Sequence, residues 1–311
     1  MTGTQQPSAA RPDRAPFGRM LTAMITPMTA DGALDTDGAG RLATYLVDDM
    51  RNDGLVVSGT TGESPTTSDA EKDRLLRAVI EAVGDRATVV AGVGTNDTAH
   101  TTELARQAER AGADALLVVT PYYNKPPQSG LAAHFTAVAD ATGLPNMLYD
   151  IPGRTGVPIA TETLIQLAQH PRIVAVKDAK GDMGASSQVM LATDLVYYCG
   201  EDMLNLPMLA LGAAGFVSVV GHVVGDRLHE MIDAYLAGRT GEALEIHREL
   251  LPVYIGIMTR TQGAIATKAA LSLLGQPGGT VRGPLIGATG QQLEQLRTDL
   301  VAGGVKLPGT A

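Results

Sequence analysis

The chain has 311 residues, which suits either one large barrel or two ordinary domains. Charged residues make up 18% and hydrophobic residues 44%, a balance typical of globular proteins and not of disordered ones. The net charge is −9 and the 24 lysines and arginines are scattered, which argues against a nucleic-acid-binding surface. The single cysteine, Cys199, excludes an internal disulfide and a cysteine-rich metal site.

The aromatic residues are unevenly distributed, with no tryptophan, three phenylalanines and eight tyrosines. A core so poor in large rings must be built from Ala, Val, Leu and Ile, as expected where helices lie close on a parallel sheet. Tyrosine is over-represented relative to phenylalanine, and its phenol can take part in proton transfer.

The sequence predicts a soluble cytoplasmic protein. No apolar run reaches the roughly 18 residues needed to cross a bilayer, so we expect no membrane partner. Residues 1–17 contain Pro, Ser and Arg without a hydrophobic stretch, which predicts a flexible tail and not a signal peptide.

From about Arg19 onward, short apolar runs alternate with amphipathic stretches. The apolar runs begin about 20 to 34 residues apart, the length of a βα unit, and are apolar on both faces like buried parallel strands. The predicted strands are Leu21–Ile25, Gly54–Val57, Thr88–Ala91, Ala115–Val119, Asn146–Tyr149, Ile173–Lys177, Leu195–Tyr198 and Gly215–Val219. Together they predict a (β/α)8 TIM barrel. A doubly wound open sheet is the alternative, but Gly92-Val-Gly94 lacks the third glycine of its fingerprint.

Helix signals lie between and after these strands. Ser68-Asp-Ala-Glu71 is a capping box, and Gly112 is placed to end a helix in the left-handed conformation. After Gly221 only helices are predicted: Asp226–Leu236, Gly241–Thr259, Gln262–Leu274 and Gln291–Val301. We therefore expect a catalytic barrel over residues 18–237 and a C-terminal helical region over residues 238–311.

Lys177 closes the sixth predicted strand, where the chemistry of a (β/α)8 barrel is found. Burial at the barrel mouth would lower the pKa of its amine, and a neutral amine can attack a ketone to form a Schiff base. The alternative is a lysine that reaches the surface to pair with a carboxylate such as Asp178.

Three further strand ends carry polar residues. Gly59-Thr-Thr-Gly-Glu63 could hold a carboxylate through its amides and hydroxyls, or form only a tight turn. Tyr122, Tyr123 and Tyr149 are either proton-relay groups, with Thr60 as a partner, or packing residues. Arg154 could bind a substrate carboxylate or form a loop salt bridge.

No histidine lies in a metal-binding pattern, and no metal is predicted. His222, the one histidine near the proposed mouth, is expected to form a local hydrogen bond.

Five motifs follow one another at strand ends: Gly59-Thr-Thr-Gly-Glu63, Pro121-Tyr-Tyr-Asn124, Leu148-Tyr-Asp-Ile-Pro-Gly-Arg154, Val176-Lys177 and Gly215-Phe-Val-Ser218. In these motifs the chain resembles the 4-hydroxy-tetrahydrodipicolinate synthase (dihydrodipicolinate synthase) family. This resemblance implies a cofactor-free homotetramer, a dimer of dimers. The implied activity condenses pyruvate with L-aspartate 4-semialdehyde in lysine and diaminopimelate biosynthesis.

The resemblance also implies roles for individual residues. Lys177 would form the Schiff base, Thr61 would hold the pyruvate carboxylate, and the backbone at Val217 would line the pyruvate pocket. The proton relay would comprise Tyr149, Thr60 and Tyr123, with Tyr123 reaching into the neighbouring subunit's site. Arg154 would bind the carboxylate of the semialdehyde.

Two questions stay open at this point. A sister pyruvate-dependent aldolase, of the N-acetylneuraminate lyase or 2-keto-3-deoxy sugar acid aldolase type, would share the lysine and the tyrosine of the fifth strand. Arg154 favours the synthase, because the sister enzymes usually lack it. Lysine inhibition is expected to be weak or absent, since Pro65–Lys72 and His100 depart from the pattern of lysine-inhibited relatives.

Overall fold

The computed structural model describes residues 14–308 of the chain. Residues 1–13 of the predicted tail and residues 309–311 of the C-terminal region lie outside the described residues. The division into a tail, a barrel and a C-terminal region therefore stays a prediction.

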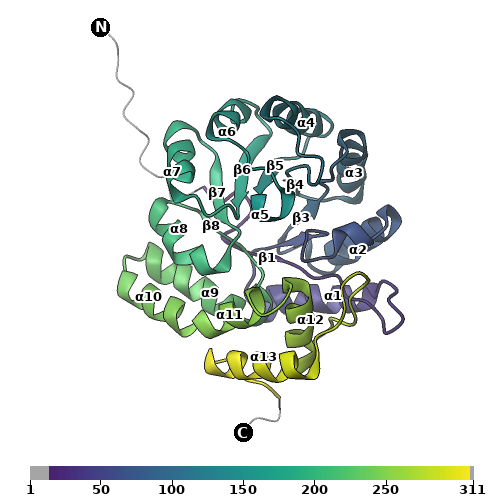
Figure 1. The fold of residues 1–311 in the computed structure, drawn as a ribbon, viewed down its shortest axis with the longest axis vertical. Helices are drawn as coiled ribbons and strands as arrows, with labels where there is room; N and C mark the ends of the chain where they lie inside the picture. The colour runs from purple at the N-terminus through teal and green to yellow at the C-terminus, as the bar shows by residue number, and fades with distance from the viewer. Residues whose placement is uncertain (1–13, 309–311) are drawn as a thin grey trace.

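Eight parallel strands form a closed barrel, in which each strand pairs with the next and β8 pairs with β1. The strands are β1 (Met20–Ala23), β2 (Gly54–Val57), β3 (Thr88–Gly92), β4 (Ala115–Val119), β5 (Asn146–Asp150), β6 (Ile173–Asp178), β7 (Val196–Cys199) and β8 (Gly215–Ser218). The helices surround the strands, and the late helices α10–α13 gather on one side of the ring (Figure 1). The predicted (β/α)8 barrel with a C-terminal helical extension is confirmed.

The helices alternate with the strands until β8 and then follow one another. Those between the strands are α1 (Thr36–Thr44), η1 (Tyr45–Asp49), η2 (Ser64–Thr66), α2 (Asp69–Val83), α3 (Thr98–Ala111), α4 (Gln128–Asp140), α5 (Pro152–Thr155), α6 (Thr161–Leu167), α7 (Met183–Ala192), η3 (Asp202–Leu204) and α8 (Asn205–Leu211). Those after β8 are α9 (Gly221–Leu236), α10 (Thr240–Glu249), α11 (Leu251–Met258), α12 (Gly263–Leu273) and α13 (Gly290–Ala302).

Local sequence signals account for most of these helix ends. The capping box at Ser68 and Glu71 is present at the start of α2, and Gly112 ends α3 with φ +93°. The prediction of one helix over Gly241–Thr259 was wrong, because α10 ends at Glu249 and α11 begins at Leu251. Pro252 lies in the first turn of α11, where its missing N–H costs nothing, but it could not continue α10.

The alternation of side chains along the strands separates two apolar layers. Met147 and Ala175 belong to the cluster inside the barrel, whereas Leu148 and Val176 pack in the layer between the barrel and the helices. Successive residues of a strand point to opposite faces, so Tyr149 and Lys177 lie on the same face as Met147 and Ala175. The fold therefore directs both polar groups into the barrel.

His222 joins the segments that directly follow β1 and β8, the two strands at which the barrel closes. Its Nε2 accepts a hydrogen bond from the Ile25 amide at 3.0 Å, and its Nδ1 lies 2.7 Å from the Val219 carbonyl oxygen. An acceptor at Nε2 and a donor at Nδ1 define a neutral ring. Burial lowers the pKa of His222 to about 4, against the opposing hydrogen bond to Val219. The predicted local hydrogen bond is confirmed.

This ring should make the protein acid-sensitive. Below about pH 6.5 the His222 ring binds a proton in the unfolded chain but stays neutral in the folded protein until the pH nears 4. The free energy of unfolding therefore falls as the pH drops toward 4. Between pH 7 and pH 4 the wild type should lose about 3 kcal/mol more unfolding free energy than His222→Gln. Denaturant titrations at several pH values measure this difference.

His100→Gln, at a half-exposed ring, is the matched control and should leave in place the acid sensitivity that the His222 ring supplies. Equal acid dependence of the wild type and His222→Gln would contradict the neutral assignment.

Candidate active site

Lys177 and Tyr149 are neighbours at the C-terminal ends of β6 and β5. The two residues are register partners in the sheet, and the Lys177 Nζ lies 4.3 Å from the centre of the Tyr149 ring. Lys177 is 4% exposed and Tyr149 is 5% exposed. The sequence placed both at strand ends, and the structure brings them into contact.

Burial lowers the pKa of Lys177 from 10.5 to about 8, with the charge of Arg154 also lowering it and that of Asp202 opposing. Within residues 14–308 no carboxylate lies close enough to form an ion pair with this amine. At pH 7 about one amine in ten is then neutral, against roughly three in ten thousand for an ordinary lysine. Lys177 can therefore act as a nucleophile near neutral pH.

The alternative of a surface pair with Asp178 was wrong. Asp178 lies next along β6 and so points to the opposite face of the sheet, where it accepts hydrogen bonds from the Lys180 amide at 2.8 Å and from the Ser186 hydroxyl. Asp178 is thus occupied outside the barrel while Lys177 lies inside it.

Gly200, which directly follows β7, makes room for the lysine side chain. A Cβ atom at this position would lie 2.9 Å from both Cγ and Cε of Lys177, tighter than real contacts allow. Sequence reasoning missed this residue. The available signal was a glycine immediately after a strand, where a close approach is common.

The Tyr149 phenol is held in its protonated form. Burial raises its pKa to about 12, against opposing effects of the Arg154 charge and a hydrogen bond with Thr60. At neutral pH the phenol is therefore protonated and can donate a hydrogen bond. The contact with Thr60 joins the end of β5 to the loop after β2.

A cavity of about 210 Å³ opens above these groups at the C-terminal end of the barrel. It is lined by Thr60, Tyr122, Tyr149 and Arg154, among others, and its volume suits a small molecule. Three of the predicted site residues thus share one cavity, and Lys177 adjoins it beneath the Tyr149 ring.

The remaining predicted site residues do not line this cavity. Thr61 is 9% exposed, and Val217 is fully buried inside the barrel. Tyr123 does not line the cavity of its own chain, and 88% of its surface is exposed. Its φ of +75° is strained for a bulky residue, and such strain is commonly found at functional positions.

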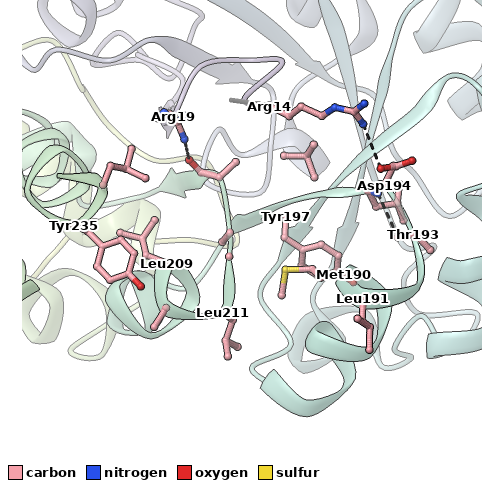
Figure 2. A pocket seen from close by; sticks show the side chains of 17 residues that line it. Arg14, Arg19, Met190, Leu191, Thr193, Asp194, Tyr197, Leu209, Leu211 and Tyr235 are labelled. Carbon is pink, nitrogen blue, oxygen red and sulfur yellow. Dashed lines mark hydrogen bonds and ion pairs between the residues drawn. The ribbon is translucent and has the colours of Figure 1, made fainter. Parts of the chain in front are cut away.

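A larger hollow lies at the opposite end of the barrel and is not the candidate active site. It measures about 430 Å³ and lies between the starts of β1, β7 and β8 and the ends of α7 and α8 (Figure 2). Arg14 pairs there with Asp194 at 3.4 Å, and Arg19 donates to the Ala214 carbonyl. Catalytic groups of a (β/α)8 barrel lie at the other end, where Lys177 is found.

No cofactor or metal site stands out in the described part of the chain. Residues 14–308 contain no group of three or more His, Cys, Asp or Glu side chains placed to hold a metal ion. None of the helices in that range is long and apolar enough to span a membrane. The absence of a cofactor stays a prediction.

Residues at the start of α2 and in α3 include those that depart from the pattern of lysine-inhibited relatives. Asp69 Oδ2 lies 2.9 Å from the His100 Nε2, and Asp69 Oδ1 lies 3.8 Å from the Lys72 Nζ. Asp69 therefore contacts both His100 and Lys72, and the expectation of weak lysine inhibition stays a prediction.

Known proteins resemble this chain over nearly its whole length. The sequence model of the dihydrodipicolinate synthetase family matches residues 16–302. The 4-hydroxy-tetrahydrodipicolinate synthase 2 of Streptomyces coelicolor is 67% identical over 294 residues, covering 94% of this chain and 98% of the relative. The 4-hydroxy-tetrahydrodipicolinate synthase of Acidothermus cellulolyticus is 68% identical over 290 residues, covering 93% of this chain and 94% of the relative.

Solved structures agree with this result. A dihydrodipicolinate synthase from Cyanidioschyzon merolae with lysine bound superposes with a TM-score of 0.91 at 41% identity, covering 93% of this chain and 99% of that chain. The chloride-inhibited enzyme from Acinetobacter baumannii, complexed with pyruvate, superposes with a TM-score of 0.88 at 33% identity, covering 93% and 100%. The chain belongs to the dihydrodipicolinate synthetase family.

Proposed function

We propose that this protein is an enzyme that condenses pyruvate with L-aspartate 4-semialdehyde to 4-hydroxy-tetrahydrodipicolinate, in lysine and diaminopimelate biosynthesis. The observation that carries the proposal is the buried amine of Lys177, which lies against the Tyr149 ring at the barrel mouth and forms no ion pair with the part of the chain that the structure describes. The names of relatives at 67% and 68% identity favour this activity over that of a sister aldolase.

The first step is the capture of pyruvate by Lys177. The neutral amine attacks the ketone carbon, water leaves, and an imine links the Lys177 nitrogen to the former carbonyl carbon. The imine withdraws electrons, so the adjacent methyl group can lose a proton and become an enamine nucleophile. Thr61, with its backbone amide, is proposed to hold the pyruvate carboxylate, and the backbone at Val217 to line the pocket.

The departing water needs a proton, which the Tyr149 phenol is suited to donate. Its pKa of about 12 keeps it protonated at neutral pH, and Thr60 can pass a proton to it through their hydrogen bond. Tyr123 is proposed to complete the relay in the site of a neighbouring subunit. Its 88% exposure in the single chain is consistent with a residue that a partner covers.

The enamine then attacks the aldehyde carbon of the second substrate. Arg154 lies on the exposed rim of the cavity, in α5, where its guanidinium can pair with the carboxylate of the semialdehyde. Attack by the substrate's own amino group on the imine carbon closes the ring and releases the Lys177 amine. No external cofactor is required by these steps.

We further propose a cytoplasmic homotetramer built as a dimer of dimers. Tyr123 supports one contact between copies, at the barrel mouth. A second contact would cover apolar surface, and Leu191 and Leu211, at the rim of the hollow in Figure 2, are 74% and 37% exposed.

Borohydride reduction tests the Schiff base directly. Treatment of the enzyme with pyruvate and borohydride should attach a reduced pyruvyl group to the Lys177 peptide, as read by mass spectrometry. Lys268, which is equally buried but paired with Glu63, is the internal control and should stay unlabelled. Lys177→Ala should lose activity while keeping the melting temperature of the wild type within a few degrees. An unlabelled Lys177 peptide in the wild type would rule the mechanism out.

Substitution of Arg154 tests the proposed binding of aspartate semialdehyde. Arg154→Met should raise the half-saturating concentration of aspartate semialdehyde about tenfold to a hundredfold, since a charged hydrogen bond is worth about 1.5–3 kcal/mol. Pyruvate labelling should persist in this variant. Arg106→Met, on the surface of α3, is the control and should behave as the wild type. Cleavage of N-acetylneuraminate in place of semialdehyde turnover would favour the sister aldolase.

A further inference from the structure

Glu63, two residues after Thr61, is a buried carboxylate in a strained backbone conformation. Its φ is +56°, and its side chain is 1% exposed. Its Oε1 lies 2.6 Å from the Lys268 Nζ, and its Oε2 accepts a hydrogen bond from the Arg282 amide at 2.8 Å. A left-handed non-glycine residue persists only where its surroundings hold it, and both partners come from the C-terminal region.

Lys268, on α12, is as deeply buried as Lys177 but has partners. Its side chain is 3% exposed, and its Nζ donates to the Thr280 carbonyl oxygen at 2.6 Å as well as pairing with Glu63. Removing one member of a buried pair leaves an uncompensated charge, so each partner fixes the other in place. The pair therefore ties α12 to the loop that follows β2.

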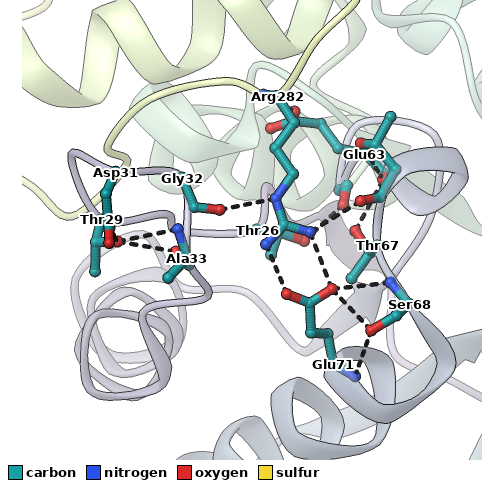
Figure 3. Close-up of polar contacts among 12 residues, drawn as sticks. Thr26, Thr29, Asp31, Gly32, Ala33, Glu63, Thr67, Ser68, Glu71 and Arg282 are labelled. Carbon is teal, nitrogen blue, oxygen red and sulfur yellow. Dashed lines mark hydrogen bonds and ion pairs between the residues drawn. The ribbon is translucent and has the colours of Figure 1, made fainter.

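Arg282 makes a second connection to the same loop (Figure 3). Its guanidinium meets the Glu71 carboxylate with two nitrogens, at 2.6 and 2.9 Å, and donates to the carbonyl oxygens of Thr66 at 2.9 Å and Gly32 at 2.8 Å. Glu71 in turn caps α2 through Ser68. One side chain thus bridges the loop after β1, the loop after β2 and the start of α2.

Backbone hydrogen bonds connect Glu63 to the turn that contains Thr60 and Thr61. The Glu63 amide donates to the Thr60 carbonyl oxygen at 3.1 Å, and the Glu63 carbonyl oxygen accepts from the Thr66 amide at 3.0 Å and from the Thr67 hydroxyl at 2.9 Å. Ser58, at the start of the turn, is also left-handed, with φ +59°. The turn therefore has a left-handed residue at each end, and contacts with Lys268 and Arg282 of the C-terminal region stabilise it.

We propose that Arg282, Lys268 and Glu63 are positioning residues that fix the Thr60–Thr61 turn for the capture of the pyruvate carboxylate. None of the three lines the active-site cavity, so they act through the turn and not on the substrate. The C-terminal region is then part of the active-site support. This inference rests on the proposed function, because it assigns the carboxylate to that turn.

Pyruvate labelling measures this positioning without the second substrate. Arg282→Met removes the guanidinium that connects the loop after β1, the loop after β2 and the start of α2. A small misplacement of the groups that bind a substrate can reduce the efficiency of its reaction by up to about a hundredfold. The pyruvate concentration that half-saturates borohydride labelling of Lys177 should therefore rise about tenfold or more. The pH midpoint of labelling should stay that of the wild type, since Lys177 keeps its burial.

Arg260→Met is the matched control. Arg260 also belongs to the C-terminal region and binds a carboxylate with two nitrogens, at 3.0 and 3.2 Å from Asp299, but it does not touch the turn. Its half-saturating pyruvate concentration should stay within about twofold of the wild type, whatever its melting temperature, because the measurement reports binding-site geometry. A merely structural role of Arg282 would lower the melting temperature of both variants alike and leave pyruvate capture unchanged.

Arg282→Lys serves if Arg282→Met does not fold. It keeps the positive charge beside Glu71 but cannot form the fork that also reaches Thr66 and Gly32, so pyruvate capture should still weaken. Wild-type pyruvate capture in the folded Arg282 variant, or an equal loss in Arg260→Met, would overturn the inference. Absence of labelling in the wild type would instead overturn the proposed function.

Discussion

Burial of the Lys177 amine, with no ion-pair partner among residues 14–308, is the constraint on which the site depends. The alternation of β6 places Lys177 on the interior face with Ala175, and the Tyr149 ring covers its amine at 4.3 Å. Gly200 leaves space for the side chain on the neighbouring strand. The cost of desolvating the charge lowers the pKa to about 8, which is what allows the amine to act as a nucleophile.

The two buried lysines of this chain, Lys177 and Lys268, differ in whether a carboxylate pairs with the amine. Lys268 is 3% exposed and faces Glu63 at 2.6 Å, and Lys177 is 4% exposed and faces an aromatic ring. Burial lowers the pKa of both lysines, but at Lys268 the hydrogen bond and the charge of Glu63 oppose this effect and favour the charged amine. Under the proposed function, Lys268 thus supports the Thr60–Thr61 turn and Lys177 supplies the reactive nitrogen.

Much of the fold could be predicted because it follows from local periodicity. Each predicted strand begins within one residue of the observed one, since runs buried on both faces stand out from amphipathic helices. Lys177 and Tyr149 could be predicted as neighbours of the barrel mouth because both end a parallel strand. The break between α10 and α11 was missed because apolar residues continue through Pro252.

The supports of the site could not be predicted in the same way. The contacts of Glu63 with Lys268 and Arg282 join residues more than two hundred positions apart, and a single long-range ion pair leaves no periodic signal in a sequence. The candidate site accounts for only part of the surplus of tyrosines: Tyr149 lines its cavity, whereas the Tyr198 hydroxyl donates to the Gly18 carbonyl oxygen at the other end of the barrel.

The pH dependence of Lys177 reactivity tests the central claim most directly. The initial rate at which pyruvate and borohydride label the Lys177 peptide should be followed by mass spectrometry from pH 6 to pH 11. Burial without a partner predicts a rate that rises with a midpoint near the folded pKa of about 8. A midpoint near 10.5, the value of an ordinary lysine, would contradict the account, because the amine would then be neither desolvated nor activated by the fold.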